Sequence, residues 1–404
     1  MSRPKTVGIV TTSFPRSAGD FAGRFVFELA RGFTRGGYRV EVVVPEPSTP
    51  YHWSMDADWL EGIRVYPAPY FRPTGYQRLF FDAGVPDNIR RHPALIGLVP
   101  PGVLSLVHLV FRLRHRWDAV MSHWLLPSAL VAGWGRRSGV RHLAVAHSGD
   151  VHLLTKPMLR HLSSALYLSA DRFGFISETL RRRFLDALPA DAANRFRARS
   201  LVTPMGIHVD DMRGAAQRQT LRDEWGLKLF TLLFLGRLVP IKGVSLLLEA
   251  AVGLRDVEIL IAGDGPCRGE LADSAAKLDI GVRFMGAVSP EERGTLLTAC
   301  DALVLPSRTL PGGRCEGLPL VLSEAMAAGL PVIAADTGAV RELISHGENG
   351  WVFSEGSALE LREAIVSLQR DEGLRCAFRR GGLKTVESRD WRRLLPVFES
   401  ALFS

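Results

Sequence analysis

Short apolar runs alternate with amphipathic, helix-like segments along the chain. The first run, Thr6–Thr11, precedes a segment with apolar residues at helical spacing, Phe25–Arg35, and then a second apolar run, Arg39–Val44. A strand, a helix and a strand in this order predict a parallel βαβ unit. Later apolar runs are expected to extend the same sheet: Ala119–Met121, Leu143–Ala146, Phe173–Ile176 and Ser200–Val202.

The alternation starts again at Thr231, which predicts a second sheet. Its expected strands are Leu232–Leu235, Glu258–Ala262, Val282–Phe284, Ala302–Leu305, Pro331–Ala334 and Gly350–Phe353. The fold class is therefore α/β, with two doubly wound, Rossmann-like domains. Ligands of such sheets bind at the carboxyl ends of the strands, so we expect an active site in a cleft where the two domains face each other.

Length and composition agree with two domains. The chain has 404 residues, of which 47% are hydrophobic and 23% charged, and one core rarely extends over so long a chain. The N-terminal segment enters a strand at once and lacks the pattern of a signal peptide, so we expect a cytoplasmic protein. The scattered cysteines predict reduced thiols and argue against a zinc site.

A net charge of +8 raises the question of an anionic partner. Arginines gather in the N-terminal half, but no nucleic-acid-binding signature accompanies them, so nucleic acid is not expected. Residues 94–111 carry no formal charge, and Pro100-Pro101-Gly102 interrupts them, which predicts a helix from Val103 to Arg116. Two interpretations stay open: a buried helix of the first domain, or a basic and apolar element in peripheral contact with an anionic membrane.

Two cations and two carboxylates form the candidate chemistry of the second domain. Arg237 and Lys242 follow a predicted strand, and Glu316 and Glu324 flank the start of a predicted helix, Leu320 to Ala328, with Pro319 in or near its first turn. Guanidinium, ammonium and the N–H groups of a helix start are the groups that bind phosphate oxygens. The carboxylates can accept hydrogen bonds from hydroxyl groups. Taken singly, each residue is ordinary; their order and context carry the hypothesis.

These motifs resemble a known family. Gly236-Arg237, Lys242-Gly243, Gly263-Asp264-Gly265-Pro266, and the block from Cys315 to Val332 with its two glutamates resemble the donor-binding domain of retaining glycosyltransferases with the GT-B fold, family 4, also called glycosyl transferases group 1. Other motifs extend the resemblance over nearly the whole chain: His147-Ser148-Gly149-Asp150-Val151, Thr203-Pro204-Met205-Gly206, Thr337-Gly338-Ala339 and Gly347-Glu348-Asn349-Gly350.

The resemblance implies a domain plan and a function. Residues 1–203 would bind the acceptor, residues 204–385 the nucleotide-sugar donor, and 386–404 would form a helix that crosses back to the first domain. The expected activity is a hexosyltransferase that moves a hexose from a UDP- or GDP-sugar to an acceptor hydroxyl with retention of configuration. The acceptor is unknown, with a lipid-linked one as a candidate, and the product would belong to cell-surface polysaccharide or glycolipid.

The resemblance also implies site residues. The catalytic set would be His147, Arg237, Lys242 and Glu316. The donor-binding set would be Gly23, Arg237, Lys242, Gly317, Leu318, Leu320, Val321 and Glu324. Many family members have a Gly-Gly pair after the first strand, whereas this chain has separated glycines, of which Gly23 before the helix is the best candidate for a close backbone approach. Arg16 and Arg24 are expected to assist with phosphate.

No metal and no cofactor are expected besides the co-substrate. Asp56-Ala57-Asp58 matches the Asp-x-Asp pattern of metal-dependent transferases, but it follows no predicted strand. Retention through a double displacement needs a carboxylate nucleophile, and the family offers no agreed one, so we expect a front-face route. Alternatives are a catalytically inactive nucleotide-sugar-binding protein, or an epimerase or hydrolase of the same fold. A nicotinamide dehydrogenase is disfavoured because Gly-x-Gly-x-x-Gly does not follow the first strand.

Overall fold

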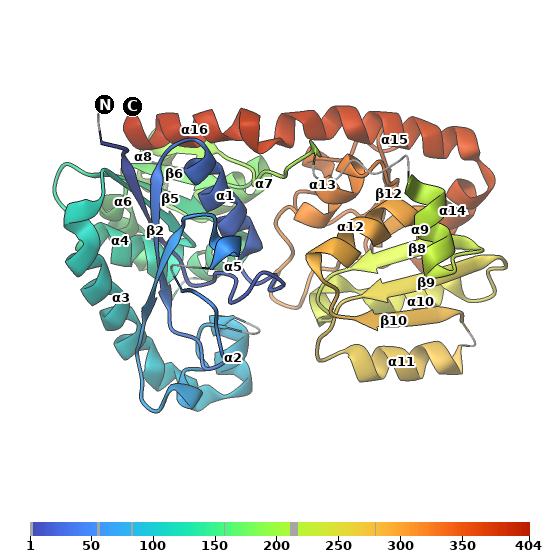
Figure 1. Ribbon diagram of the computed structural model, residues 1–404, viewed down its shortest axis with the longest axis horizontal. Coiled ribbons are helices and arrows are strands. Elements are labelled where there is room, and N and C mark those ends of the chain that lie inside the picture. Colours follow the sequence, from blue (N-terminus) through green and yellow to red (C-terminus); the bar gives the residue numbers. More distant parts are fainter. Residues whose placement is uncertain (1–2, 55–56, 82–83, 157, 211–216, 279) are drawn as a thin grey trace. The chain divides into compact units, whose positions relative to one another are not determined.

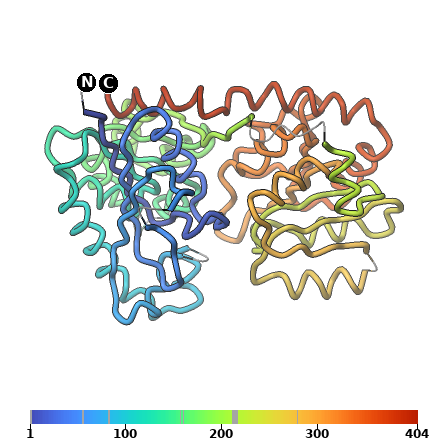
Figure 2. The backbone as a smooth tube through the Cα atoms, viewed as in Figure 1, coloured from blue at the N-terminus to red at the C-terminus, as the bar shows by residue number. Residues whose placement is uncertain are grey.

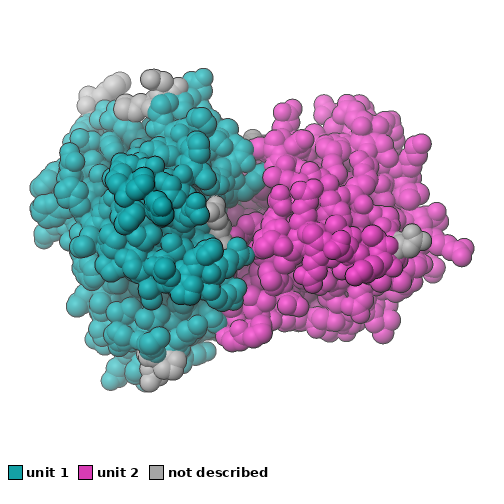
Figure 3. Space-filling model, turned by 90° about the horizontal axis from the view of Figure 1, so that it is seen from below, with its two compact units in different colours: residues 1–206, 391–404 teal, residues 207–390 magenta. Residues whose placement is uncertain are grey.

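The chain divides into two compact units (Figure 1). The computed structural model describes residues 3–54, 57–81, 84–156, 158–210, 217–278 and 280–404. The N-terminal unit comprises Met1–Gly206 with Trp391–Ser404, and the C-terminal unit comprises Ile207–Asp390 (Figure 3). The sequence analysis placed these boundaries at 203/204 and 385/386. They lie later because Ile207 forms a β-bridge with Asp390 inside the C-terminal unit, while Gly206 packs against the Trp391 indole inside the N-terminal unit.

The N-terminal unit has one parallel sheet of seven strands in the order β3-β2-β1-β4-β5-β6-β7. The strands are β1 (Thr6–Val10), β2 (Arg39–Pro45), β3 (Arg64–Ala68), β4 (Ala119–His123), β5 (Arg141–Ala146), β6 (Arg172–Phe175) and β7 (Ser200–Val202). All but β3 coincide with predicted apolar runs. β3 was missed because it lies at the sheet edge and contains Pro67, which an edge strand tolerates.

Nine α-helices belong to the described part of this unit. They are α1 (Arg24–Arg35), α2 (Val85–Arg91), α3 (Val99–Leu113), α4 (Leu130–Gly135), α5 (Ser148–Leu154), α6 (Ser163–Ser169), α7 (Glu178–Asp186), α8 (Ala190–Arg199) and α16 (Trp391–Phe403). On one face of the sheet, Leu106 and Val110 of α3 pack with Val10, Val43 and Val120. Helices α1 and α16 contact each other and adjoining strands.

Helix α3 begins four residues before the predicted start at Val103. Pro100 and Pro101 lie in its first turn, where a missing N–H breaks no intrahelical hydrogen bond. The prolines therefore start the helix instead of separating two pieces. Its end at Leu113 is followed by one 3₁₀ turn, Arg114–Arg116.

The segment that leads into β1 and the end of α16 lie side by side in the N-terminal unit (Figure 2). The Lys5 ammonium lies 4.4 Å from the centroid of the Phe403 ring, and Tyr38 stacks on the same ring with centroids 5.5 Å apart. Helix α16 is thereby fixed to the unit that begins the chain.

The C-terminal unit has a parallel sheet of six strands in the order β10-β9-β8-β11-β12-β13. Its strands are β8 (Phe230–Leu235), β9 (Val257–Ala262), β10 (Val282–Gly286), β11 (Ala302–Leu305), β12 (Val332–Ala335) and β13 (Trp351–Phe353). Its helices are α9 (Arg218–Trp225), α10 (Val244–Ala251), α11 (Arg268–Lys277), α12 (Pro290–Ala299), α13 (Leu320–Ala327), α14 (Ala358–Arg370) and α15 (Glu372–Val386).

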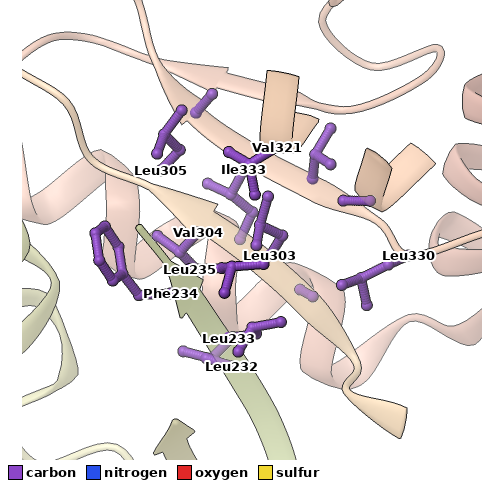
Figure 4. Packing of buried hydrophobic residues seen from close by; sticks show 14 of the residues in the cluster. Leu232, Leu233, Phe234, Leu235, Leu303, Val304, Leu305, Val321, Leu330 and Ile333 are labelled. Atoms are coloured by element: carbon purple, nitrogen blue, oxygen red, sulfur yellow. The ribbon is translucent and has the colours of Figure 1, made fainter. Parts of the chain in front are cut away.

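The central strands of this sheet are apolar on both faces, as expected when helices cover a parallel sheet on both sides. Leu232–Leu235 of β8 and Leu303–Leu305 of β11 are buried, and Ile333 and Leu330 pack beside them (Figure 4). Val321 of α13 joins the same cluster. The start of α13 is therefore fixed against the middle of the sheet, which gives the adjoining loops a rigid base.

Candidate active site

Strand order reverses direction in each sheet at one point, between β1 and β4 in the N-terminal unit and between β8 and β11 in the C-terminal unit. The loops that leave neighbouring strands at such a point diverge to opposite faces, and ligands of doubly wound sheets bind there. In the C-terminal unit these loops are 236–243 after β8 and 306–319 after β11. They contain Arg237, Lys242 and Glu316.

The structure brings Lys242 and Glu316 together. The Lys242 Nζ lies 2.5 Å from the Glu316 Oε1. The other carboxylate oxygen, Oε2, accepts a hydrogen bond of 2.6 Å from the hydroxyl of Ser307. Both side chains of the ion pair are 15% exposed, whereas Ser307 is buried. The carboxylate is therefore held at both oxygens, and the pair keeps a small exposed surface.

Two glycines let the loops approach this closely. A Cβ at Gly338 would lie 2.1 Å from the carbonyl oxygen of Glu316, and a Cβ at Gly243 would lie 2.0 Å from that of Pro306. Both glycines have positive φ, +57° and +61°, which residues with a Cβ adopt at a cost. The N–H of Ala339 also donates to the carbonyl oxygen of Gly317 at 3.1 Å. These contacts fix the position of the loop before α13.

Arg237 lies on the same loop as Lys242. Its backbone follows β8 and Gly236 directly, and its side chain is exposed. The Lys242 side chain turns back over Gly236, because a Cβ there would be 3.5 Å from the Lys242 Cε and 3.8 Å from Nζ. The ammonium therefore lies beside the residue that precedes Arg237. That both cations serve one ligand stays a prediction.

Helix α13 starts at Leu320, as predicted, with Pro319 as its N-cap residue. The predicted donor-binding residues Gly317, Leu318 and Leu320 are half-buried, and Val321 is buried. The first N–H groups of any helix lack carbonyl partners within the helix, and the helix dipole adds positive potential. This helix start follows Glu316 by four residues, so the carboxylate that pairs with the Lys242 ammonium lies shortly before the helix N–H groups.

Glu324 lies one turn inside α13 and forms an ion pair with Arg293 of α12. Both side chains are largely buried, at 14% and 16% exposure. The sequence analysis placed Glu324 in the donor-binding set, as an acceptor of hydrogen bonds from hydroxyl groups, and gave no role to Arg293. Any hydroxyl contact by Glu324 would therefore involve a carboxylate whose position an arginine already fixes. The two positions are 31 residues apart in the sequence, and no local pattern indicated this pair.

In the N-terminal unit, His147 directly follows β5 and is the N-cap residue of α5. It is buried, and its Nε2 lies 3.2 Å from the Nδ1 of His123, which ends β4. The rings of Phe25 and Trp124 complete the cluster, with centroids 4.8 Å and 4.9 Å from that of His147. His123 was missed by the sequence analysis, although it follows a predicted strand in the same way as His147. We name Phe25, His123, Trp124 and His147 the histidine cluster.

Burial determines the charge of the histidine cluster. Desolvation lowers the pKa of His123 to about 3 and that of His147 well below its usual value, with the neighbouring His123 as a second cause. Both rings are therefore neutral near pH 7. The Nε2 of His123 has no hydrogen-bond partner among the described residues. Neutral rings can exchange hydrogen bonds with hydroxyl groups as donor or acceptor.

Asp150 orders the backbone around the histidine cluster. Its carboxylate accepts hydrogen bonds from the N–H groups of Leu125 at 2.6 Å, His147 at 2.9 Å and Val151 at 2.9 Å. Burial nevertheless raises the pKa of Asp150 to about 7, and the three N–H donors only partly offset that effect. Asp150 therefore joins the loops after β4 and β5.

Gly23 is the N-cap of α1 with φ +67°. A Cβ there would lie 2.4 Å from the carbonyl oxygen of Ser13, so contact with the chain's own loop already requires glycine. Arg16 forms an ion pair with Asp20 at 2.5 Å, and Arg24 forms one with Glu28 at 2.7 Å. The two arginines expected to assist with phosphate are thus both engaged by carboxylates of their own segment.

The structure shows no metal centre in its described portion. Within residues 3–54, 57–81, 84–156, 158–210, 217–278 and 280–404, no group of three His, Cys, Asp or Glu side chains could hold a metal ion. Asp56 of the Asp56-Ala57-Asp58 pattern lies outside the described residues. The expectation of metal-independent chemistry therefore stays a prediction.

Comparison with protein families assigns both units. Residues 217–385 match the model of glycosyl transferases group 1, and residues 22–222 match that of the glycosyl transferase 4-like domain. A GDP-mannose-dependent alpha-(1-6)-phosphatidylinositol monomannoside mannosyltransferase of Mycobacterium tuberculosis is 30% identical over 76% of this chain and 80% of the relative. The chain belongs to the group 1 glycosyltransferase family. This confirms the family predicted from the motifs.

Other relatives of this glycosyltransferase agree with the assignment. A phosphatidyl-myo-inositol mannosyltransferase of Mycobacterium leprae is 33% identical over 57% of this chain, a match that spans 59% of that relative's length. Among solved structures, Anabaena Alr3699/HepE in complex with UDP and glucose superimposes with a TM-score of 0.74 at 20% identity, covering 100% of both chains. The GT-B fold predicted from the sequence is thereby confirmed.

Proposed function

We propose that this glycosyltransferase moves a mannosyl group from GDP-mannose to a hydroxyl group of a glycolipid, with retention of configuration and without a metal ion. The Lys242–Glu316 pair at the start of α13 is the observation that carries the proposal. The names of the mycobacterial relatives support mannose as the sugar, phosphatidylinositol compounds as the acceptor class and, for one of them, GDP as the carrier.

The cations and the helix start would bind the leaving diphosphate. Negative charge grows on phosphate oxygens as the sugar departs, and fixed donors in that position stabilise the transition state more than the ground state. In the proposal, Arg237, Lys242 and the first N–H groups of α13, around Leu318, Leu320 and Val321, supply these donors. Two cations and a helix dipole can do so without a metal ion.

The carboxylates would hold hydroxyl groups. Glu316 would bind hydroxyl groups of the transferred sugar, and Glu324 would accept hydrogen bonds from the ribose of the nucleotide. Gly317 would let the backbone approach the sugar closely. His147 and Gly23 would contribute from the N-terminal unit, His147 as a neutral partner of a sugar hydroxyl. The burial that lowers the pKa of His147 supports that neutral role.

The contacts of Glu316 support a front-face route to retention. A nucleophilic carboxylate needs one oxygen available to attack the anomeric carbon, whereas Oε1 of Glu316 is held by Lys242 and Oε2 by Ser307. In the proposed route, the C–O bond to the diphosphate breaks and a short-lived oxocarbenium ion forms. The acceptor oxygen then bonds to the same face, and its proton passes to the departing phosphate oxygen.

The reaction would take place at the cytoplasmic face of a membrane, where a water-soluble nucleotide sugar and a lipid acceptor meet. One segment, Pro93–Arg116, is long and apolar enough for a membrane span by length and composition, and only 17% of its most apolar window is buried. The proposal uses this segment at the membrane surface and not as a span.

A coupled assay tests the function. Purified enzyme is given GDP-mannose, UDP-glucose or UDP-galactose, with and without a phosphatidylinositol acceptor in detergent, and released nucleotide is measured. GDP release that requires acceptor, together with an α-linked mannolipid seen by NMR, is the expected result. GDP release without acceptor would indicate a hydrolase, a β-linked product would exclude retention, and no release from any donor would indicate an inactive binding protein.

Thermal-shift screening against GDP, UDP and ADP tests the nucleotide separately. A ligand at a hundred times its dissociation constant stabilises the folded state by about 2.7 kcal/mol. We expect GDP to raise the melting temperature most. A larger shift with UDP would leave the transferase function intact and overturn the choice of GDP-mannose.

A further inference from the structure

Three helices of the N-terminal unit expose large apolar side chains on one surface. Leu104 and Phe111 of α3 are 68% and 51% exposed, Trp134 of α4 is 60% exposed, and Leu168 of α6 is 79% exposed. We name these four side chains the α3–α4–α6 face. Exposed apolar side chains are ordinary one at a time, but four on adjoining helices need a physical reason.

Helix packing explains why these side chains point outward together. Gly135 packs against Val110 of α3, where an added Cβ would lie 2.5 Å from a Val110 methyl carbon, and Gly133 packs equally closely against Ser169 of α6. Trp134 lies between these two glycines, so its side chain leaves α4 away from both neighbouring helices. Figure 1 shows α3, α4 and α6 side by side on the same flank of the unit.

The helix period places the remaining members on the same surface. Phe111 follows the buried Val110, and Leu168 precedes the buried Ser169. Leu104 lies seven residues, or two turns, before Phe111, so the two share one side of α3. Ile96, in the turn before α3, is also 63% exposed. The apolar surface therefore extends along the whole segment that carries no formal charge.

Basic residues outnumber acidic residues in the segment that carries the α3–α4–α6 face. From Asp87 to Asp171 the sequence contains Arg90, Arg91, Arg112, Arg114, Arg116, Arg136, Arg137, Arg141, Lys156 and Arg160, against Asp87, Asp118, Asp150 and Asp171. Asp150 is buried, and the other three aspartates pair with Arg90, Arg3 and Arg136 in turn. The guanidinium of Arg114 lies 3.5 Å from the centroid of Phe111, so positive charge lies directly beside an apolar ring.

We propose that the α3–α4–α6 face and its surrounding arginines dock on the surface of an anionic lipid bilayer. Apolar side chains can enter the boundary between head groups and acyl chains while arginines contact lipid phosphates. Trp and Arg are both suited to this boundary, because each combines an apolar body with a polar end. The surface recruits the enzyme to its acceptor, so this inference rests on the proposed glycolipid function for its purpose but not for its evidence.

A second copy of the chain fits this surface less well. Symmetric dimers bring the same patch of two subunits together, which would place the arginines of one copy against those of the other. A bilayer with anionic lipid offers an apolar interior to the exposed apolar side chains and negative charge to the arginines. The charge balance therefore favours lipid over self-association.

Vesicle flotation with the full chain tests the proposal. The wild-type protein is mixed with phosphatidylcholine vesicles with or without phosphatidylglycerol, at low and high salt. We expect binding only to the vesicles with phosphatidylglycerol, weakened by salt because the charges at the surface are screened. Equal binding to both vesicle types, or none to either, would overturn the proposal.

Two sets of variants separate the apolar and the charged contributions. Leu104→Ser, Phe111→Ser and Trp134→Ser together should weaken binding about tenfold or more, whereas the matched control Leu229→Ser, Val252→Ser and Leu359→Ser, which changes exposed apolar residues of the C-terminal unit, should not. Arg91→Gln, Arg112→Gln and Arg137→Gln should each weaken binding about five-fold. Arg255→Gln, Arg370→Gln and Arg380→Gln serve as the charge control. Equal effects of test and control variants would overturn the proposal.

Two further readouts distinguish the remaining outcomes. Light scattering would detect a dimer that the serine variants disrupt, and that result would assign the surface to a second copy and contradict lipid docking. Transfer to an acceptor in detergent micelles should be retained by the serine variants, because they lie outside the candidate active site. Loss of vesicle binding with this activity retained supports the proposal. Vesicle binding by a protein that transfers no sugar would refute the proposed function and leave the docking surface standing.

Discussion

Replacing Glu316 by Gln should separate the binding of nucleotide from the transfer of sugar. The Glu316 carboxylate has two tasks in the account: it opposes part of the Lys242 charge and it orients sugar hydroxyls. The amide keeps the shape and loses the charge. GDP should therefore bind to the variant at least as tightly as to the wild type, while kcat should fall.

The geometry sets the magnitudes. The Lys242 and Glu316 atoms at 2.5 Å attract each other by about 7 kcal/mol before desolvation, at an effective dielectric constant of about 20. A diphosphate bound to the same ammonium is repelled by the carboxylate, by about 3 kcal/mol at roughly 6 Å and the same dielectric constant. Loss of the ion pair's positioning offsets much of this gain, so we expect GDP to bind about 1 kcal/mol more tightly. The lost hydroxyl contact should lower kcat by about a hundred-fold, or about 3 kcal/mol.

Calorimetry and kinetics measure the two effects independently. GDP binding is titrated calorimetrically into wild type and Glu316→Gln, and kcat is measured with GDP-mannose. Glu363→Gln, an exposed position on α14, changes the net charge equally and serves as the control. Weaker GDP binding by the Glu316 variant would refute the proposed competition for Lys242, and an unchanged kcat would remove Glu316 from the catalytic set.

Three further predictions follow from the same contacts. Ser307→Ala should lower kcat about tenfold and leave GDP binding unchanged, because the lost hydrogen bond to a charged group is worth about 1.5 kcal/mol or more. Ser307→Thr keeps the hydroxyl and should retain activity. Equal losses of kcat in both variants would mean that the hydroxyl does not position Glu316. Gly338→Ala should lower the free energy of unfolding by about 2 kcal/mol or more, since a Cβ adds backbone strain and meets the Glu316 carbonyl oxygen at 2.1 Å. The control Gly356→Ala, at positive φ with nothing within 4 Å, should lower it by about 1 kcal/mol. Urea unfolding measures both variants, and equal losses of stability would contradict the close approach at Gly338. The third prediction concerns the pH dependence of stability. Burial lowers the pKa of His123, His142 and His147 and raises that of Asp150 to about 7. Near pH 5 the unfolded state therefore binds three protons on these histidines that the folded state does not bind, and the folded state binds one proton on Asp150 that the unfolded state does not. The net difference, three minus one, should make stability fall as pH drops below about 6.5, by about 3 kcal/mol per pH unit, and Asp150→Asn should steepen this slope by about half; an unchanged slope in that variant would contradict the raised pKa of Asp150.

Most strands of the two α/β domains were predictable because buried parallel strands appear in the sequence as local apolar runs. β7 and β11 have the predicted bounds, and the other predicted strands differ only at their ends. β3 was not predicted, because Arg64 and Pro67 make an edge strand resemble a loop. The start of α3 was misplaced for a related reason, since Pro100 and Pro101 can begin a helix as well as interrupt one.

The residue types of the candidate site were predictable from the sequence, whereas the side chains that each residue contacts were not. Lys242 and Glu316 were assigned to one region, but their direct ion pair and the hydroxyl of Ser307 depend on how two loops leave neighbouring strands. Arg293 reaches Glu324 only through the packing of α12 and α13. His123 meets His147 because β4 and β5 are neighbours in the sheet. No periodic pattern or motif in the sequence indicates any of these contacts.

The central claim is that the cations at the start of α13 bind the diphosphate of an activated sugar and stabilise its departure. Lys242→Ala tests this most directly, through turnover of GDP-mannose with acceptor and a parallel thermal unfolding curve. The account predicts a loss of turnover of about a hundred-fold or more in a protein that remains folded. Near-normal turnover in folded Lys242→Ala enzyme would contradict it.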